Sequence, residues 1–123
     1  MRFVLAVLLM LTVAPVWAKW VVVAESGSTV YSIDPSHIKK EGDLRRLFLL
    51  EERNRPGTGG EMSRKSQVEF DCKNGTARTR SVSGHTGAMG GGEVLYNSRG
   101  NDKPHIVQAD SVEGRVMKRA CSQ

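Results

Sequence analysis

Cys72 and Cys121 are the two cysteines of this 123-residue chain, and the chemistry of such a pair depends on where the protein works. The interior of a cell keeps thiols reduced, whereas exported compartments let them oxidise to disulfides. The sequence has no C-x-x-C redox motif, and two thiols bonded to each other cannot act as nucleophiles. In a short exported chain, this pair therefore predicts one structural disulfide.

Residues 1–18 (MRFVLAVLLMLTVAPVWA) have the three-part pattern of a cleavable export signal. Arg2 provides positive charge, Phe3–Val13 is apolar apart from one threonine, and Ala18 is a small residue at the expected cleavage position. A membrane anchor is the alternative, but the apolar run is shorter than the ~20 residues that span a bilayer. No cysteine that could accept a lipid lies near Ala18. We expect a periplasmic or secreted protein without a stable membrane anchor, in which residues 19–123 form a single domain.

Residue types that support catalysis or metal binding are present without the spacing that this chemistry needs. His37, His85 and His105 are scattered, with no H-E-x-x-H pair, so each is expected on the surface or in a turn. The segment Gly84–Gly92 lacks the Gly-Lys-Ser/Thr of a phosphate-binding loop and is expected to be a loop or an irregular edge. No serine stands in a G-x-S-x-G motif. We expect no enzyme activity, no metal and no cofactor.

Basic side chains form two groups that could bind an anionic partner. Arg78 and Arg80 are two residues apart, so they share one face of a strand, and Lys73 is close by in sequence. The second group flanks an expected hairpin and comprises Lys39, Lys40, Arg45 and Arg46. Either group could instead keep an edge of the sheet soluble. We select Lys73, Arg78 and Arg80 as the candidate binding residues.

The overall charge favours acidic partners. The chain has a formal net charge of +5 at pH 7, which removal of Arg2 with the export signal would lower by one unit. This mild excess favours an anionic surface or an acidic patch on another protein, and it is also compatible with a merely soluble basic surface. Nucleic acid is disfavoured, because an exported protein rarely meets it and the basic residues are not interleaved with stacking aromatic residues.

Short apolar runs between turns predict an antiparallel sheet that starts with a buried strand at Trp20–Ala24. Further strands are expected at Thr29–Ile33, His37–Lys40, Leu44–Arg53, Ser66–Cys72 and Thr76–Ser83, with a short one at Glu93–Tyr96. Leu44–Arg53 is also rich in helix formers. We favour a strand because a glycine-containing turn precedes it, and because its four consecutive apolar residues fit a central strand covered on both faces.

The strand that contains Cys72 alternates between apolar and polar residues. Val68, Phe70 and Cys72 point to the same side, so Cys72 is expected on the apolar face of the sheet. The dipeptide Asn74-Gly75 then predicts a tight type I′ hairpin turn between this strand and the next one.

The last element is predicted to be a helix. Asp110 or Ser111 can cap it, and Glu113 completes a capping box from Asp110. Its apolar stripe at helical spacing comprises Val112, Val116, Met117, Ala120 and Cys121. A bond between the two cysteines would pin this helix across the sheet. A series of strands followed by one helix predicts an α+β fold with an antiparallel sheet.

The order of these features resembles the surface-adhesin protein E family of Gram-negative bacteria. The similar segments are Trp20, Val30–Ile38, Leu47–Leu50, Ser63–Lys65, Glu69–Cys72, the glycine-rich segment, Asp110–Val112 and Cys121. They extend over nearly the whole chain after the export signal. The resemblance implies an antiparallel sheet with a C-terminal helix tethered by a Cys72–Cys121 disulfide. It also implies adhesion to host extracellular-matrix and serum proteins, and the formation of dimers.

Two functional hypotheses follow. The leading one is a small exported binding protein without catalytic activity, adhesin-like, which binds a host matrix protein or another anionic partner through Lys73, Arg78 and Arg80. The alternative is a structural or envelope-assembly accessory of the periplasm that has no host ligand, with a sheet that pairs with itself or with another envelope protein. An obligate oligomer that captures no ligand would favour the alternative.

Overall fold

The computed structural model describes residues 19–101 and 103–123, so the predicted export signal at residues 1–18 lies outside the described part of the chain. Within that part, a series of strands precedes one α-helix. The strands are β1 (Val21–Ser26), β2 (Thr29–Ile33), β3 (Lys39–Glu41), β4 (Leu44–Arg53), β5 (Ser63–Asp71), β6 (Thr76–His85), β7 (Val94–Arg99) and β8 (His105–Ile106). The helix α1 spans Val112–Cys121, and two short 3₁₀ turns are η1 (Pro35–His37) and η2 (Ala88–Gly90).

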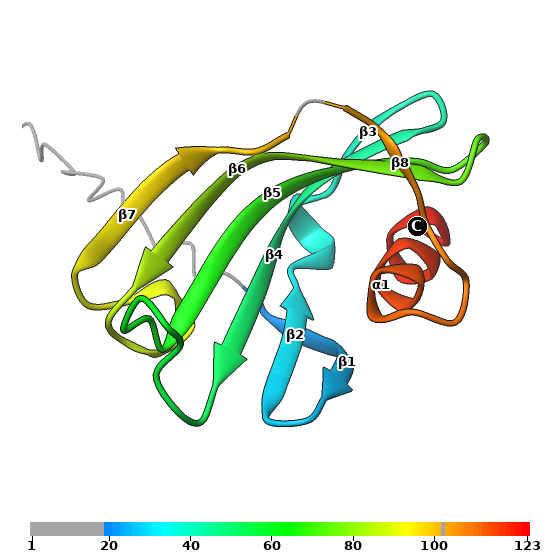
Figure 1. The fold of residues 1–123 in the computed structure, drawn as a ribbon. Helices are drawn as coiled ribbons and strands as arrows, with labels where there is room; N and C mark the ends of the chain where they lie inside the picture. The colour runs from blue at the N-terminus through cyan, green and yellow to red at the C-terminus, as the bar shows by residue number, and fades with distance from the viewer. Residues whose placement is uncertain (1–18, 102) are drawn as a thin grey trace, which may run out of the picture.

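The strands form one antiparallel sheet in the order β1-β2-β4-β5-β6-β7. The short strands β3 and β8 pair with β4 and β6 respectively. Figure 1 shows that the sheet is curved and that α1 lies against one of its faces. The predicted α+β fold, with an antiparallel sheet and a C-terminal helix, is confirmed.

The strand β4 confirms the strand that was predicted at Leu44–Arg53, with the same bounds. It is central, because β2 and β5 pair with its two sides. The expectation that both of its faces are covered is wrong over part of its length. Leu47 faces the core and is buried, whereas Phe48 on the opposite face is 42% exposed. The difference arises because α1 covers one face of the sheet and no second helix covers the other within the described part of the chain.

The prediction of a buried first strand is also wrong. β1 lies at the edge of the sheet, and the side chains of Val21 and Val22 are 40% and 55% exposed. Ala24 is buried and Val23 packs against the core, so the strand contributes part of its length to the interior. A run of β-branched residues favours an extended strand, but this preference does not determine whether the strand is central or at an edge.

The turn between β5 and β6 is longer than the predicted tight hairpin. Asp71 pairs with Thr76, which leaves the four-residue loop Cys72–Gly75. The Asp71 carboxylate accepts hydrogen bonds from the backbone N–H groups of the second and third loop residues, at 3.1 and 3.0 Å. These bonds stabilise the wider loop, in which Gly75 has a φ of 66°. Cys72 therefore lies in the loop rather than on the strand itself.

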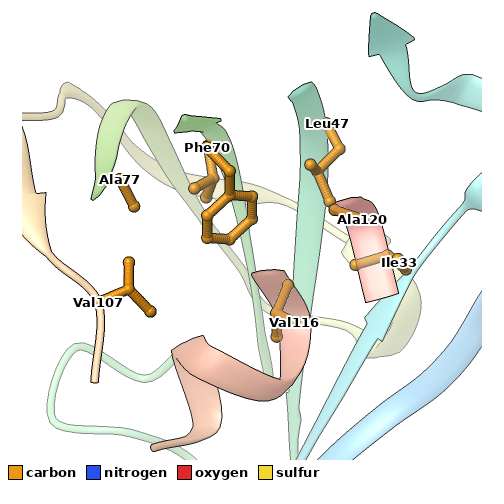
Figure 2. Close-up of a cluster of buried hydrophobic side chains, with 8 residues drawn as sticks. Ile33, Leu47, Phe70, Ala77, Val107, Val116 and Ala120 are labelled. Atoms are coloured by element: carbon orange, nitrogen blue, oxygen red, sulfur yellow. The ribbon is translucent and has the colours of Figure 1, made fainter. Parts of the chain in front are cut away.

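The hydrophobic core lies between the sheet and α1. Phe70 on β5 and Val116 on α1 are almost completely buried, and Figure 2 shows them at the centre of the cluster. The buried cluster comprises Ile33, Leu47, Val68, Phe70, Ala77, Val107, Val116 and Ala120. Full burial of a side chain of valine to phenylalanine size stabilises a fold by about 1.5–3 kcal/mol. This layer therefore holds α1 on the sheet.

The start of α1 is capped by Ser111, one of the two predicted candidates. The Ser111 Oγ accepts a hydrogen bond from the N–H of Gly114 at 3.0 Å. The capping box from Asp110 is wrong, because the Glu113 carboxylate instead bonds to the Nε2 of His105, with an Oε1–Nε2 distance of 2.6 Å.

The predicted apolar stripe of α1 is confirmed, and Gly114 extends it. Val116 and Ala120 are fully buried, and Met117 and Cys121 pack against the core. A Cβ atom at Gly114 would lie 2.3 Å from the carbonyl oxygen of Gln108. The absence of a side chain at this position therefore lets the helix approach the turn that precedes it.

The predicted disulfide is confirmed. The Cys72–Cys121 bond joins the β5–β6 loop to the last residue of α1 and links positions that are 49 residues apart. Together with the Ser111 cap, it fixes both ends of the helix.

The glycine-rich segment is a loop for only part of its length. Gly84 belongs to β6, where it pairs with both neighbouring strands. The remainder folds back on the sheet, where the Ser63 Oγ donates to the carbonyl oxygen of Gly87 at 2.6 Å and accepts from the N–H of Gly90 at 2.9 Å. η2 contacts β4 and β5, and Leu50 is fully buried on the face opposite α1. This segment therefore covers one end of that face.

Candidate binding surface

The face of the sheet opposite α1 carries arginines around a single carboxylate. Arg46 on β4, Glu69 on β5 and Arg78 on β6 are paired in register, so they lie side by side on three neighbouring strands. Val68 and Phe70, on either side of Glu69 in the sequence, belong to the core beneath α1. Because side chains alternate along a strand, Glu69 and its partners lie on the opposite face.

A β-bulge brings a further arginine to the same carboxylate. The register between β5 and β6 shifts between Gln67 and Val68, which leaves Arg80 without a direct partner on β5. A bulge of this kind changes the direction of a side chain. The Arg80 Nη1 consequently lies 3.7 Å from the Glu69 Oε2. We call Arg46, Arg78 and Arg80 around Glu69 the arginine cluster.

The electrostatics of the arginine cluster keep Glu69 ionised. Its carboxylate lies 3.0 Å from the Arg46 Nη2 and 2.8 Å from the Arg78 Nη2. Burial raises the pKa of Glu69, but the hydrogen bond from Arg46 and the positive charge of Arg78 outweigh this effect and lower the pKa below its usual value. The Glu69 side chain is 6% exposed, whereas the three guanidinium side chains are 30–39% exposed. Three positive charges therefore surround one negative charge, with the positive groups accessible.

The structure groups the predicted binding residues differently from the sequence interpretation. Arg78 and Arg80 meet at Glu69, and they are joined by Arg46, which the sequence placed in the second basic group. Lys73 lies apart from them, exposed in the β5–β6 loop. The sequence interpretation did not include Glu69, because its place between the arginines depends on the strand register and not on a local motif.

The same face has an aromatic end. Phe48 is two residues from Arg46 on β4 and is 42% exposed. The Lys65 Nζ lies 4.6 Å from the centroid of the Phe48 ring and 6.0 Å from that of the Trp20 ring. At these distances the ammonium group is attracted to the ring faces. Arginine and aromatic residues are enriched in protein interfaces, so the composition of this face suits a protein partner.

A buried carboxylate at Asp34 ties the start of the described chain to η1. The backbone N–H of Lys19 donates to the Asp34 Oδ2 at 3.0 Å, and the His37 Nδ1 lies 2.7 Å from the same oxygen. Burial raises the pKa of Asp34, but hydrogen bonds from Ser36, His37 and Lys19 lower it to about 2. The aspartate is therefore ionised at neutral pH and fixes this corner of the fold.

A cavity of about 270 Å³ lies on the other face, between α1 and the sheet. Its lining includes Glu51 and Arg64, which form an ion pair, and the apolar side chains of Val112 and Val116. Burial lowers the pKa of Arg64, but the bond and the charge of Glu51 raise it above the usual value. Because the charges of Glu51 and Arg64 neutralise each other, the cavity is less suited to an anionic partner than the arginine cluster is.

The histidines are dispersed in the structure as well. His37 and His105 are exposed, as expected, but the expectation is wrong for His85, which is 7% exposed in β6 with its Nε2 2.8 Å from the Ser83 Oγ. Within the described residues, no three His, Cys, Asp or Glu side chains are grouped so that they could hold a metal ion. No helix of the described residues has the length and apolar character needed to cross a membrane.

The fold and the surface together define a class of protein: a small antiparallel sheet, tied by a disulfide to its C-terminal helix, that presents a basic and aromatic face. The model of the family described as surface-adhesin protein E matches residues 20–122. The chain belongs to the surface-adhesin protein E family, which confirms the resemblance seen in the sequence. Membership suggests an exported or surface adhesin. Neither a curated protein nor a solved structure matches the chain.

Proposed function

We propose that this protein is a non-catalytic adhesin-like protein that binds an acidic protein partner on the arginine cluster. The observation that carries the proposal is the excess of positive charge on an accessible face, where Arg46, Arg78 and Arg80 all form ion pairs with the one carboxylate of Glu69. Family membership favours an acidic patch on a host extracellular-matrix protein as the partner.

Arg80 is the best placed of the three arginines to bind a partner. It is the most exposed, at 39%, and its 3.7 Å distance from Glu69 is the longest of the three ion pairs. A guanidinium group binds a carboxylate through two parallel hydrogen bonds, which gives both strength and orientation. Lys73 would add an outer contact from the β5–β6 loop, and Phe48 would add apolar contact area.

We also propose which part of the chain forms the active protein and in which compartment it acts. Cleavage after Ala18 would release residues 19–123 as a single domain in the periplasm or outside the cell. The disulfide between Cys72 and Cys121 suits an oxidising compartment of this kind.

The test is capture of basement-membrane proteins on an immobilised 19–123 chain, measured by surface plasmon resonance at low and high salt. Replacement of Arg78 and Arg80 by glutamine should weaken capture about tenfold, because the cluster loses most of its excess charge. The matched control, Arg55→Gln with Lys103→Gln, lowers the net charge equally at exposed positions outside the arginine cluster and should leave capture unchanged. Equal capture by the cluster variant and the unmodified chain would refute the assignment.

A second candidate function is the role in envelope assembly, and the observation that favours it is the exposed edge of the sheet at β7. β7 is an edge strand, and the side chains of Val94 and Leu95 are 53% and 42% exposed. Exposed apolar edges favour pairing with another chain. Under this alternative, sedimentation would show an obligate oligomer, including a homodimer, that Val94→Lys converts to monomers, and no matrix protein would be captured.

A further inference from the structure

A groove lined by positive charge lies between α1 and β1. Arg115, Lys118 and Arg119 are spaced at i, i+3 and i+4, so they share one side of the helix. With Val23 and Ser122 they line a groove of about 370 Å³. All three cations are exposed, and none forms a salt bridge with another residue of the described chain.

The strand beside this groove has a free edge. Among the described residues, β1 pairs with β2 on one side and has no strand on the other. Proteins usually protect such edges with lysine, proline or a bulge. β1 contains neither lysine nor proline, and its protective features are the shift of register at Val23, the charge of the exposed Glu25 and the contacts of the strand with α1. Val21 and Val22 are also 40% and 55% exposed, so the edge offers both backbone groups and apolar contact.

We propose that this groove binds an extended acidic peptide, which adds to β1 as a further strand of the sheet. Addition of a strand to a free edge supplies main-chain hydrogen bonds, and side chains then determine specificity. Alternate residues of the added strand would face the α1 side, where carboxylates would meet Arg115, Lys118 and Arg119. The ligand is therefore a segment with acidic residues at every second position.

Charge also argues against a second copy of this chain at the same edge. Two β1 strands paired antiparallel about a two-fold axis would place both α1 helices on the same side of a continuous sheet. The three cations of each helix would then face those of the other, and like charges across an interface oppose association. An acidic strand has the complementary charge.

This binding site is independent of the proposed function. The groove lies on the α1 side of the sheet, and its lining contains no residue of the arginine cluster. Each site can therefore be removed without the other, and the failure of one assignment is distinguishable from the failure of the other.

The first test separates strand addition from attraction by charge alone. A fluorescein-labelled peptide of alternating Glu and Thr is titrated with the 19–123 chain and followed by fluorescence anisotropy. A peptide of alternating Glu and Pro carries the same charge but cannot complete the hydrogen bonds of a strand. A peptide of alternating Gln and Thr can form a strand but has no charge. We expect the Glu-Thr peptide to bind, and each of the other two peptides to bind at least about tenfold more weakly.

The second test locates the site. Arg115→Gln with Lys118→Gln and Arg119→Gln should weaken binding of the Glu-Thr peptide about tenfold. The control, Lys40→Gln with Arg55→Gln and Lys103→Gln, lowers the net charge equally at exposed positions outside both proposed sites and should not change binding. Circular dichroism of both variants establishes that they are folded. Binding should also shift the amide NMR signals of β1 (Val21–Ser26). Equal binding of the Glu-Pro peptide, shifts confined to the arginine cluster, or a dimer formed through β1 would each overturn the proposal.

Discussion

At the scale of single residues, Glu69 sets how positive the binding face is. Its carboxylate holds Arg46, Arg78 and Arg80 in one place and cancels one of their three charges. It is nearly buried, so its removal leaves the guanidinium groups without a fixed partner. The same residue therefore stabilises the fold and limits the attraction for an acidic partner.

Glu69→Gln should lower stability and raise affinity for an acidic partner. The variant loses three charged interactions at a buried position, which we expect to cost about 2 kcal/mol because the arginines are partly exposed to solvent. It also raises the net charge of the face by one unit. Urea denaturation and capture of basement-membrane proteins measure the two effects. A variant that gained stability, or captured less while folded, would contradict the assigned role.

The pH dependence of stability provides a check on the same carboxylate. The pKa of Glu69 is lower in the folded protein than its ordinary value of 4.5, so its ionised form is favoured by folding. This contribution is fully present above pH 4.5 and is lost as the pH falls through the lower folded value. Thermal unfolding at several acidic pH values should therefore show a shallower decline for Glu69→Gln than for the unmodified chain.

Individual residues could be predicted from the sequence more readily than their partners. The i, i+2 spacing of Arg78 and Arg80 indicates a shared face, and the structure brings both to one carboxylate. A two-residue turn at Asn74-Gly75 would have placed Arg80 opposite Glu69. The Asp71 side chain stabilises a four-residue loop instead, so Arg78 takes that position. The register depended on these side-chain bonds, which the dipeptide pattern does not reveal.

At the scale of elements, α1 depends on close contact at its first turn. Gly114 is buried where the helix meets the carbonyl oxygens of Gln108 and Ala109. Alanine normally favours a helix by up to about 1 kcal/mol relative to glycine. At this position the added methyl group would have to displace backbone atoms.

Gly114→Ala should therefore destabilise the protein, in spite of the higher helix propensity of alanine. A Cβ atom would lie 2.3 Å from the Gln108 oxygen, and overpacking of this kind costs about 1–3 kcal/mol. The melting temperature measured by circular dichroism should fall. Arg115→Ala, at the neighbouring exposed position, is the control and should change stability by less than about 0.5 kcal/mol. A higher melting temperature for Gly114→Ala would show that the contact is not as close as described.

The type and bounds of an element could be predicted where its own residues decide them. β4 follows directly from its apolar run and the preceding turn. The position of an element could not be predicted in the same way, because β1 has an equally apolar run and yet lies at an edge. Which strands are central is decided by the topology of the whole sheet.

At the scale of the whole molecule, the two faces of the sheet differ in composition, and one disulfide attaches α1 to the sheet. α1 and the core occupy one face, and the arginine cluster and the aromatic end occupy the other. The Cys72–Cys121 bond holds the helix on the sheet, so the core face stays covered by α1 while the opposite face stays accessible to solvent.

Removal of the disulfide by Cys72→Ala with Cys121→Ala should lower stability without changing the arginine cluster. Closure of a loop across 49 residues corresponds to about 4 kcal/mol in the chain-entropy model. Urea denaturation measures the loss, and the reduced unmodified protein should behave like the double variant. Unchanged stability in both would mean that packing of Val116 and Ala120 alone retains the helix.

Cleavage of the expected export signal after Ala18 would change the bond from the Lys19 nitrogen to the Asp34 carboxylate. Cleavage after Ala18 would turn this amide into a terminal ammonium ion, placed 3.0 Å from a buried carboxylate. Maturation would thereby create an ion pair that the precursor lacks. A chain that begins at Lys19 should unfold at a higher temperature than one that retains Ala18. This advantage should fade as the pH rises beyond about 8, where the ammonium ion loses its proton. Equal melting temperatures at neutral pH would show that processing adds nothing to the fold.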